Sequence, residues 1–210
     1  MSLNITCFPD GPLGENTYIA EDSATGFKAV IDPGYYGFDV KMEIGSSAFL
    51  KYILLTHGHH DHFAAAQQYL DEYPEAVFIA PAGDTYLMYK SRDNEMFSMS
   101  HGQENYICPE AHRLVKEGDT FVLGETEFRV IETPGHTEGS ICYVTDNELF
   151  SGDTLFRLSV GNTSFETGDW NTMVRSIQNK LYTLDEGLTV WPGHGAATTI
   201  GFEKRANPFV

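Results

Sequence analysis

Hydrophobic and polar residues alternate in four short segments near the start of the chain, and glycine, proline and aspartate separate them. These segments are residues 3–8, 16–20, 27–31 and 52–55. Alternation with a period of two, together with β-branched residues, is typical of strands that bury one face. The chain is therefore predicted to open with a β-meander.

The rest of the chain combines predicted helices with a second β-rich series. A helix is predicted from residue 61 to about residue 69, where three consecutive alanines favour that conformation. Further predicted elements are a strand at 76–80, a β-rich series at 120–156 with turns at 123–125 and 145–147, a helix at 169–182 and a strand at 188–191. Two β-rich halves, each followed by helix, predict an α+β fold in which two packed sheets carry helices on their outer faces.

Residues 82–118 have no regular pattern and are rich in methionine and aromatic residues, namely Tyr86, Met88, Tyr89, Met96, Phe97, Met99 and Tyr106. The insertion is predicted to cover the functional site, where it either contacts substrate or packs onto the sheets as a hydrophobic cluster. Both interpretations remain open. Three other residues there, His101, Cys108 and His112, are irregularly spaced and lack a glycine-supported turn, so packing or surface roles are predicted rather than metal binding.

The composition fits one soluble domain spanning residues 1–210. With 210 residues and 41% hydrophobic residues, the chain can bury a sizeable core without a second domain. It has no apolar stretch of membrane-spanning length and no recognisable export signal. The odd number and wide spacing of Cys7, Cys108 and Cys142 argue against a disulfide framework. A cytoplasmic location is expected.

The charge balance argues against a nucleic-acid partner. The chain has 13 Lys and Arg against 30 Asp and Glu, a formal net charge of -17. Binding to phosphates normally requires clusters of basic residues, and the sequence contains no such cluster. The acidity is interpreted as a solvated surface, and a small-molecule substrate is expected.

The densest concentration of reactive side chains directly follows the predicted strand at 52–55. It consists of Thr56, His57, Gly58, His59, His60, Asp61 and His62. Imidazoles and carboxylates at this density are typical of a site for divalent cations. His57 and His59, at the strand end, can converge on one ion. Asp61 and His62, at the start of the predicted helix, can reach a second ion.

Three further candidates are isolated in the sequence but share one setting. His136, Asp153 and His194 each follow a β-rich run and have a neighbouring glycine. Glycine permits a tight turn and close approach of the backbone, and loops at strand ends often carry function. Together with the histidine cluster they make a set of seven candidate ligands.

Residues 56–62 match the pattern T-H-x-H-x-D-H without a gap, and the chain thereby resembles the metallo-β-lactamase superfamily. The three isolated candidates follow in the order found in that family. The resemblance implies a four-layer αβ/βα sandwich. It also implies that His57, His59 and His136 hold one metal, that Asp61, His62 and His194 hold a second, and that Asp153 bridges them.

Two adjacent divalent ions would favour hydrolysis, because a water shared between them loses a proton near neutral pH and becomes a nucleophile. Asp153 would hold the ions together, and Asp61 is a candidate to orient the hydroxide. Zinc is the first choice of metal, while iron and manganese accept the same ligands. A thiolate can leave without a protonating acid, so thioesters are favoured, with lactones and other activated esters as alternatives.

Within the superfamily, residues 133–140 and 151–156 resemble the glyoxalase II branch, which hydrolyses S-acyl glutathiones. Residues 198–209 are similar to its small bacterial members, which lack the C-terminal helical domain. Relatives usually carry a basic residue where this chain has Asn162. Arg157 is a candidate to bind a substrate carboxylate instead, and a solvated surface cation is the alternative.

Three residues are candidates to orient the ligands by hydrogen bonding. Asp32, in a Val-Ile-Asp-Pro-Gly segment, is another position that the family repeats. A buried aspartate and a metal-bound histidine each need a partner, although Asp-Pro-Gly is also a common turn. Thr56 and Thr137, each beside a candidate ligand histidine, are assigned the same role.

Three classes of function are consistent with the sequence. The first is a dinuclear, glyoxalase II-like hydrolase of thioesters. The second is an oxidoreductase similar to the persulfide dioxygenases, with one iron held by two histidines and an aspartate. The third is a non-catalytic module that binds metals for stability.

Overall fold

The computed structural model describes residues 2–11, 13–90 and 108–210. Its first six strands form one sheet in sequence order: β1 (Leu3–Phe8), β2 (Thr17–Asp22), β3 (Lys28–Ile31), β4 (Leu50–Leu54), β5 (Val77–Pro81) and β6 (Arg113–Val115). The pairs β1/β2 and β2/β3 are antiparallel, and the pairs from β3 to β6 are parallel. The predicted opening meander is confirmed for its first three strands, whereas the fourth predicted strand, β4, pairs parallel with β3 and does not continue the meander.

A second six-stranded sheet has the order β14-β13-β10-β9-β8-β7. Its strands are β7 (Thr120–Leu123), β8 (Thr126–Glu132), β9 (Ile141–Val144), β10 (Glu148–Gly152), β13 (Thr189–Pro192) and β14 (Thr198–Thr199). Only the β10/β13 pair is parallel among the pairs described in this sheet. A small hairpin of β11 (Leu155–Phe156) and β12 (Ser159–Val160) follows β10.

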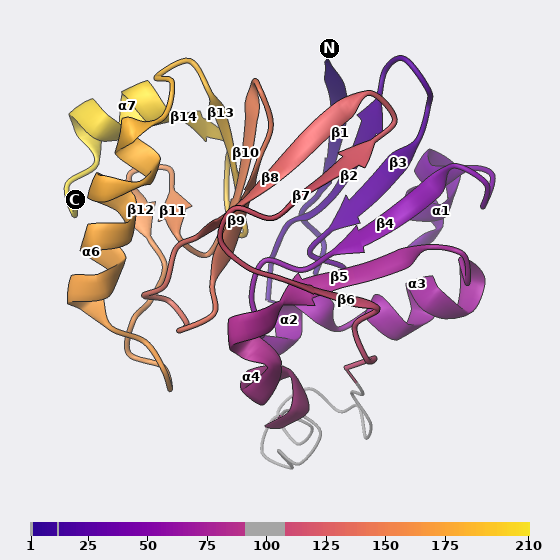
Figure 1. Ribbon diagram of the computed structural model, residues 1–210, viewed down its shortest axis with the longest axis horizontal. Coiled ribbons are helices and arrows are strands. Elements are labelled where there is room, and N and C mark those ends of the chain that lie inside the picture. Colours follow the sequence, from indigo (N-terminus) through magenta and orange to yellow (C-terminus); the bar gives the residue numbers. More distant parts are fainter. Residues whose placement is uncertain (1, 12, 91–107) are drawn as a thin grey trace.

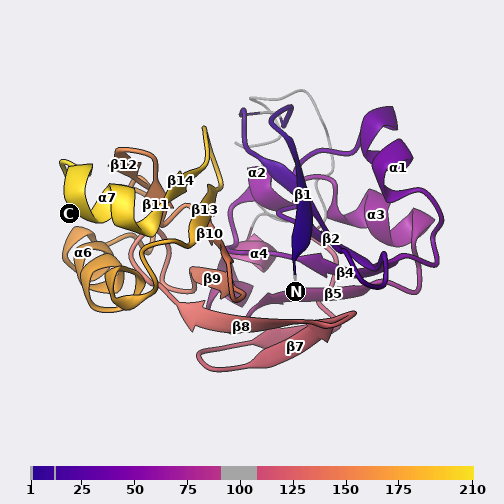
Figure 2. The ribbon, with the colours of Figure 1, turned by 90° about the horizontal axis from the view of Figure 1, so that it is seen from above.

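Helices cover the outer faces of both sheets (Figure 1). The helices α1 (Phe38–Ile44), α2 (His60–Phe63) and α3 (Ala66–Glu72) belong to the first half of the chain, and α6 (Trp170–Asn179) and α7 (Ile200–Ala206) to the second. The short helices η1 (Ala82–Asp84), α4 (Thr85–Lys90) and η3 (Leu181–Thr183) complete the described elements. Figure 2 shows α1 and α3 at one side of the molecule, α6 and α7 at the other, and the two sheets between them.

Three hydrophobic clusters account for this layering. On β2, Ile19 belongs to the cluster under α1 and α3, whereas its neighbours Tyr18 and Ala20 belong to the cluster between the sheets. A third cluster, which includes Met173 and Ile177, packs α6 onto the second sheet. Alternate residues of a strand point to opposite faces, so the period-two pattern builds two cores at once. The predicted αβ/βα sandwich is confirmed.

The single helix predicted from residue 61 to about 69 is wrong in one respect, because the chain forms two helices there. α2 ends at Phe63 and α3 begins at Ala66. The backbone N–H of Ala65 donates to the carbonyl of Pro33 at 2.8 Å, which diverts it from an intrahelical bond. A contact with the loop after β3 therefore divides the helix.

The sequence pattern did not predict α1, α4 or α7. In α1 only Val40 and Ile44 are buried, while Phe38 and Met42 are exposed. Seven residues with two buried positions give too weak a helical period to recognise. The helix is held instead by packing against the first sheet, since Val40 and Ile44 belong to its outer cluster.

Much of the methionine- and aromatic-rich insertion, including Met96, Phe97, Met99, His101 and Tyr106, lies outside the described residues. In the described part, Met88 and Cys108 are buried in the first cluster, and Tyr86 is exposed. His112 is exposed, and its Nδ1 accepts a hydrogen bond from the N–H of Phe78 at 2.9 Å. That the insertion covers the site stays a prediction.

The three cysteines are free thiols, and Cys7 is exposed while the other two are buried. Within residues 2–11, 13–90 and 108–210, no helix combines the length and the apolar character needed to cross a membrane.

Candidate metal centre

The histidine cluster occupies the loop between β4 and α2. β4 ends at Leu54, and a backbone hydrogen bond from Leu55 to Ile79 holds the chain to β5 before the loop begins. α2 is a single turn that begins at His60, so the chain reverses between His59 and His62. The side chain of His62 is fully buried. The loop thus directs histidines inward from two directions.

The other three candidates come from the second sheet. His136 follows β8, Asp153 follows β10 and His194 follows β13. β10 and β13 are parallel neighbours, so their carboxyl ends lie at the same edge of the sheet. The ion-pair and hydrogen-bond distances given below show that all seven side chains meet where the edges of the two sheets come together.

Glycine is required at two positions beside these ligands, because neighbouring atoms leave no room for a Cβ. A Cβ on Gly193 would lie 2.2 Å from Oδ1 of Asp153 and 2.7 Å from Cε1 of His62. Gly152 has a φ of 47°, and a Cβ there would lie 2.4 Å from Oγ1 of Thr56. At these two positions, glycine therefore permits close approach of the backbone to the centre.

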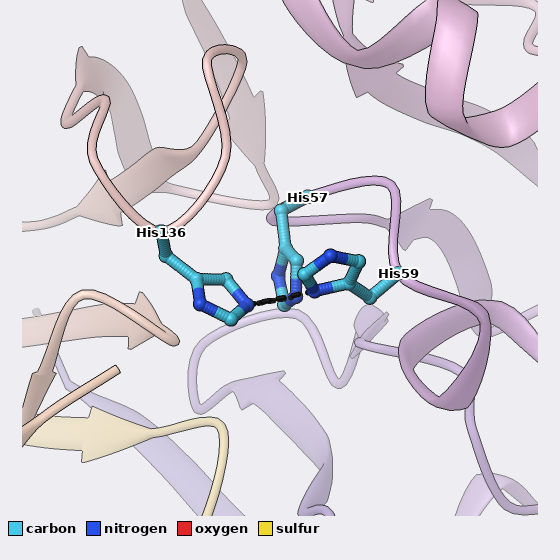
Figure 3. Close-up of side chains that lie close together, drawn as sticks. All are labelled: His57, His59 and His136. Atoms are coloured by element: carbon cyan, nitrogen blue, oxygen red, sulfur yellow. Dashed lines mark hydrogen bonds between the residues drawn. The ribbon is translucent and has the colours of Figure 1, made fainter. Parts of the chain in front are cut away.

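Three imidazoles form the first group of candidate ligands (Figure 3). Nδ1 of His59 lies 2.7 Å from Nε2 of His136, which lies 3.2 Å from Nε2 of His57. The ring planes are nearly perpendicular, at 79° between His57 and His136 and 86° between His59 and His136. Their nitrogens thus point at one shared position rather than stacking face to face.

Asp61, His62 and His194 form the second group. Oδ2 of Asp61 lies 3.6 Å from Nε2 of His62 and 3.4 Å from Nε2 of His194. The donor atoms of each group all lie within 4.8 Å of one another. Such a cluster is small enough for its atoms to share one cation.

Asp153 lies between the two groups. Its Oδ1 is 3.4 Å from Nε2 of His62, and its Oδ2 is 3.4 Å from Nε2 of His136 and 3.7 Å from Nε2 of His194. With His57 and His62 it also forms a third, overlapping cluster. One carboxylate therefore faces both groups, as a bridging ligand would.

Hydrogen bonds on the outer side of the rings determine which nitrogen carries the proton. Nδ1 of His136 lies 2.7 Å from the carbonyl of Asn162, so it donates there and leaves Nε2 as an acceptor. Thr56 donates its hydroxyl proton to Asp32 at 2.9 Å, so its Oγ1 accepts from Nδ1 of His57 at 3.1 Å. Nε2 of His57 and Nε2 of His136 thus face each other as lone pairs.

The described residues fit a pair of divalent ions. Two lone-pair nitrogens 3.2 Å apart repel each other unless a proton or a cation lies between them. Within the part of the chain that the structure describes, Nε2 of His62 and Oδ1 of Asp153 are buried and have no hydrogen-bond partner. Buried polar atoms without partners are uncommon, and nitrogen and carboxylate donors are the usual ligands of zinc and related metals.

Burial and neighbouring charges separate the two groups electrostatically. Burial, followed by repulsion from the other histidines, lowers the pKa of His59 to about 4 and the pKa of His57 well below its ordinary value. Burial also lowers the pKa of His136 to about 4, although its hydrogen bond to Asn162 acts in the opposite direction. Burial also acts to lower the pKa of His62, but Asp61 and Asp153 outweigh it and raise that pKa to about 10. The first group is therefore neutral at neutral pH, whereas an ion in the second group must displace a proton from His62.

Residues 10–194 match the family model of the metallo-beta-lactamase superfamily. The chain belongs to the metallo-β-lactamase superfamily. Among curated relatives, it is 32% identical to the hydroxyacylglutathione hydrolase GloC of Haemophilus influenzae over 211 residues, which cover 99% of this chain and 98% of GloC. The family expected from residues 56–62 is thereby confirmed.

Three solved structures match nearly the whole chain. The B3 metallo-β-lactamase BLEG-1 has a TM-score of 0.85 at 30% identity, covering 98% of this chain and 99% of BLEG-1. TTHA1623 in a di-iron-bound form has a TM-score of 0.82 at 29% identity, covering 98% of this chain and 100% of TTHA1623. ETHE1 from Myxococcus xanthus has a TM-score of 0.77 at 26% identity, covering 99% of this chain and 84% of ETHE1.

In this superfamily member, Asp32 both makes a turn and contacts the centre. Its φ of 51° is left-handed, and its carbonyl accepts from the N–H of Gly34 at 2.8 Å. Its carboxylate accepts from the backbone N–H of Thr56 at 2.8 Å and contacts Nδ1 of His62 at 3.0 Å. The two roles that the sequence left as alternatives occur together.

The two threonines differ in their contacts. Thr56 connects Asp32 to His57, as described above, whereas Thr137 does not touch a ligand ring through its hydroxyl. Oγ1 of Thr137 donates to Asp84 at 2.6 Å and lies 2.7 Å from the hydroxyl of Ser140.

The two candidate substrate residues point to other partners in this structure. The side chain of Asn162 is exposed and accepts from the N–H of Ser164 at 2.9 Å, while its carbonyl binds His136. The guanidinium of Arg157 lies 5.9 Å from the centre of the Phe202 ring on α7. Their roles in binding substrate stay predictions.

Two residues beside the centre escaped the sequence analysis. Asn16 donates from Nδ2 to the carbonyls of Pro192 and Gly195, both at 2.9 Å, and so holds the loop that carries His194. Asp84 is fully buried and binds two of the loops that carry ligands. Asn16 lies between Glu15 and Thr17, and Asp84 between Gly83 and Thr85, so no local pattern in the sequence marked either residue.

Proposed function

We propose that this protein is a metal-dependent hydrolase that binds two divalent ions and acts on thioesters. The observation that carries the proposal is the convergence of seven donor side chains, with Asp153 within 3.4 to 3.7 Å of histidines from both groups. Two ions bound there would supply Lewis acidity and a nucleophilic oxygen at neutral pH. TTHA1623, which is similar over 98% of this chain, is described in a di-iron-bound form.

The proposal assigns a role to each donor residue. His57, His59 and His136 hold one ion, and Asp61, His62 and His194 hold the other. Asp153 would help to hold both ions, because its two oxygens face histidines of both groups. Asp61 has a second role, because its Oδ2 faces the centre and can accept a hydrogen bond that orients the attacking water. Zinc is the proposed metal, with iron or manganese as substitutes.

The nature of the leaving group favours thioesters. All seven central side chains are occupied as ligands in this proposal, so none of these seven is left to protonate a leaving group. A thiolate, with a pKa of about 8.5, leaves without that help, whereas an amine does not. The similarity to GloC, a hydroxyacylglutathione hydrolase, supports the same substrate class.

An aromatic side chain beside the centre supports an organic substrate with an apolar part. Phe165 is 53% exposed, and its ring centre lies 5.4 Å from that of His59 and 6.1 Å from that of His136. An exposed phenyl ring next to candidate ligands offers apolar surface to a bound molecule. We infer that Phe165 contacts the acyl group or the thiol of the substrate.

The test combines metal analysis with turnover. The purified chain is expected to contain two metal ions and to hydrolyse S-lactoylglutathione or a simpler acyl thioester, and chelation should abolish the activity. Asp61→Asn should reduce kcat and, because Asp61 is also a ligand in this proposal, lower the occupancy of the ion that it holds with His62 and His194. Two bound ions without turnover of any thioester, lactone or activated ester would instead support a non-catalytic metal-binding module.

An oxidoreductase similar to the persulfide dioxygenases is the second candidate. The cluster of His57, His62 and Asp153 favours it, because two histidines and one carboxylate are the ligands typical of non-haem iron oxygenases. The similarity to ETHE1 supports the same alternative. One iron per chain, with oxygen uptake on glutathione persulfide and no thioester turnover, would replace the first proposal with this one.

A further inference from the structure

Asp84, at the end of η1, has a buried carboxylate whose two oxygens both accept hydrogen bonds. It is fully inaccessible to solvent. Its Oδ2 accepts from the backbone N–H of Gly58 at 2.7 Å and from the hydroxyl of Thr137 at 2.6 Å, and its Oδ1 accepts from the backbone N–H of Gly139 at 2.8 Å. All three partners are donors, so the ionised carboxylate satisfies them together.

These three hydrogen bonds reach the two loops that carry the first group of histidines. Gly58 lies between His57 and His59, and Thr137 directly follows His136. The two loops come from different sheets, following β4 and β8. Asp84 therefore joins two segments whose separation decides how far the nitrogens of His57 and His59 lie from the nitrogen of His136.

The space around Asp84 leaves little freedom for the loops to shift. A Cβ on Gly139 would lie 2.3 Å from the backbone nitrogen of Asp84, and a Cβ on Gly83 would lie 2.6 Å from Cα of Gly139. A Cβ on Gly58 would lie 3.1 Å from Cβ of Asp84. Both loops thus pack directly against the η1 backbone as well as bonding to the carboxylate.

The second group of candidate ligands is held by other residues. Asp32 contacts Nδ1 of His62, and Asn16 holds the loop around His194. The hydrogen bonds given for Asp84 reach neither of these loops. A defect at Asp84 should therefore affect one group of histidines more than the other.

We propose that Asp84 is a positioning residue that sets the spacing of His57, His59 and His136 and thereby the affinity for the ion they hold. The proposal rests on the two-ion site of the proposed function. It adds to that function a residue that never touches the metal or the substrate and that controls one ion selectively.

The experiment measures zinc binding by the full chain after removal of metal, in competition with a chromogenic chelator. Asp84→Asn keeps the size of the side chain but places an amide N–H₂ against a backbone N–H donor. We expect one of the two zinc affinities to fall by about 10- to 100-fold, as is usual when a residue that orients a ligand is changed. The affinity for the other ion should remain that of the unmodified protein.

A matched control is available at the other end of the first sheet. Asp22 is also fully buried, and it accepts hydrogen bonds from the N–H and hydroxyl of Thr25 and from the hydroxyl of Thr126. Asp22→Asn makes the same chemical change in a similar network without touching a ligand loop. It should lower the stability of the protein and leave both zinc affinities unchanged.

Milder variants keep the inference testable if Asp84→Asn fails to fold. Thr137→Val removes one of the three hydrogen bonds and should weaken the same ion by a smaller factor, while Thr137→Ser keeps the hydroxyl and should restore the affinity. His194→Ala removes a ligand of the other group. Combined with Asp84→Asn, it should leave a chain that retains neither ion tightly, although each single variant retains one.

Three results would overturn the inference: a folded Asp84→Asn chain with both affinities unchanged, an equal loss of both ions, or the same loss in Asp22→Asn. A failure of the proposed function looks different. An unmodified chain that binds a single ion would contradict the two-ion site, and the comparison of Asp84→Asn with Asp22→Asn would still test the inference on the ion that binds.

Discussion

Nδ1 of His62 lies 3.0 Å from Oδ2 of Asp32, and both side chains are buried. The same carboxylate accepts from the backbone N–H and the hydroxyl of Thr56. Asp32 therefore fixes the orientation of one ring directly and of the His57 ring through Thr56. The loop after β3, which contributes none of the candidate ligands, in this way determines how two of them face the centre.

Replacing Asp32 should weaken metal binding without removing a ligand. Asp32→Asn keeps a residue that tolerates the left-handed backbone, with its φ of 51°, but it puts amide hydrogens against donors. We expect metal affinity to fall by about 10- to 100-fold. Metal titration checks this, with Asp119→Asn in the surface turn before β7 as the control. Unchanged affinity in a folded Asp32→Asn chain would show that the contact has no orienting role.

The position of Asp153 between the two groups predicts a distinctive pattern of metal loss. Asp153→Ala should reduce occupancy of both ions together, because its two oxygens face histidines of both groups. His194→Ala should mainly weaken one ion, since its Nε2 is closest to Asp61. Elemental analysis of the two purified variants measures the difference. Equal and unchanged metal content in both would contradict the assignment of these ligands.

Neighbouring glycines separate a steric effect from a backbone effect. Gly193→Ala would place a Cβ 2.2 Å from Oδ1 of Asp153, so the carboxylate must move and metal binding should be lost. Gly195 has a φ of 78° and open space around its Cβ position. Gly195→Ala should cost about 1 to 2 kcal/mol of stability through its backbone conformation alone and leave metal content intact. Thermal denaturation and metal analysis together distinguish the two, and full metal content in Gly193→Ala would refute the steric argument.

Phe165 should affect substrate binding rather than folding. Its side chain is 53% exposed, so Phe165→Ala removes little core packing. If the ring covers an apolar acyl group, kcat/KM should fall by about tenfold, mostly through KM, for thioesters with long or aromatic acyl chains. Acetyl thioesters should respond less. Phe38→Ala on α1, where the side chain is 79% exposed, is the control. An equal effect on short and long acyl chains would argue against contact with the acyl group.

The metal-free protein should lose stability as the pH rises from about 7 toward 10. Burial acts to lower the pKa of His62, but Asp61 and Asp153 raise it to about 10, compared with an ordinary value of 6.5. Between these values the folded chain holds a proton that the unfolded chain has released, so rising pH favours unfolding. Urea denaturation with a chelator present, at neutral and alkaline pH, measures the change. In His62→Gln the decline should be smaller, and an identical decline would assign it to other groups.

The candidate ligands could be recognised in the sequence because their signals are local. Residues 56–62 place histidines and an aspartate within one loop, and glycine lies next to His136, next to Asp153 and next to His194. The contacts of the glycines explain why the pattern is informative, since Gly152 and Gly193 leave no room for a Cβ. A site whose residues have such local signals can therefore be predicted from the sequence.

Local patterns predicted the strands better than the helices. The strand β2 could be predicted from its period-two pattern, because its two faces are buried in separate hydrophobic clusters. The division between α2 and α3 depends on Pro33, which is remote in sequence from Ala65 and whose carbonyl takes the N–H that a continuous helix would use. No property of residues 61–69 by themselves indicates that interruption.

The sequence alone determined the fold class, the family and the seven candidate ligands, because each rests on a local pattern: the alternation of the strands, the cluster at residues 56–62, or a glycine beside an isolated candidate. Only the tertiary structure decided which of these side chains approach one another and which residues hold them there. Asp84 is 26 residues from Gly58 and 53 from Thr137, and Asp32 is 30 residues from His62. The hydrogen-bond partners of a buried carboxylate are brought to it by the packing of the sheets. The residues next to it in the sequence therefore do not indicate those contacts.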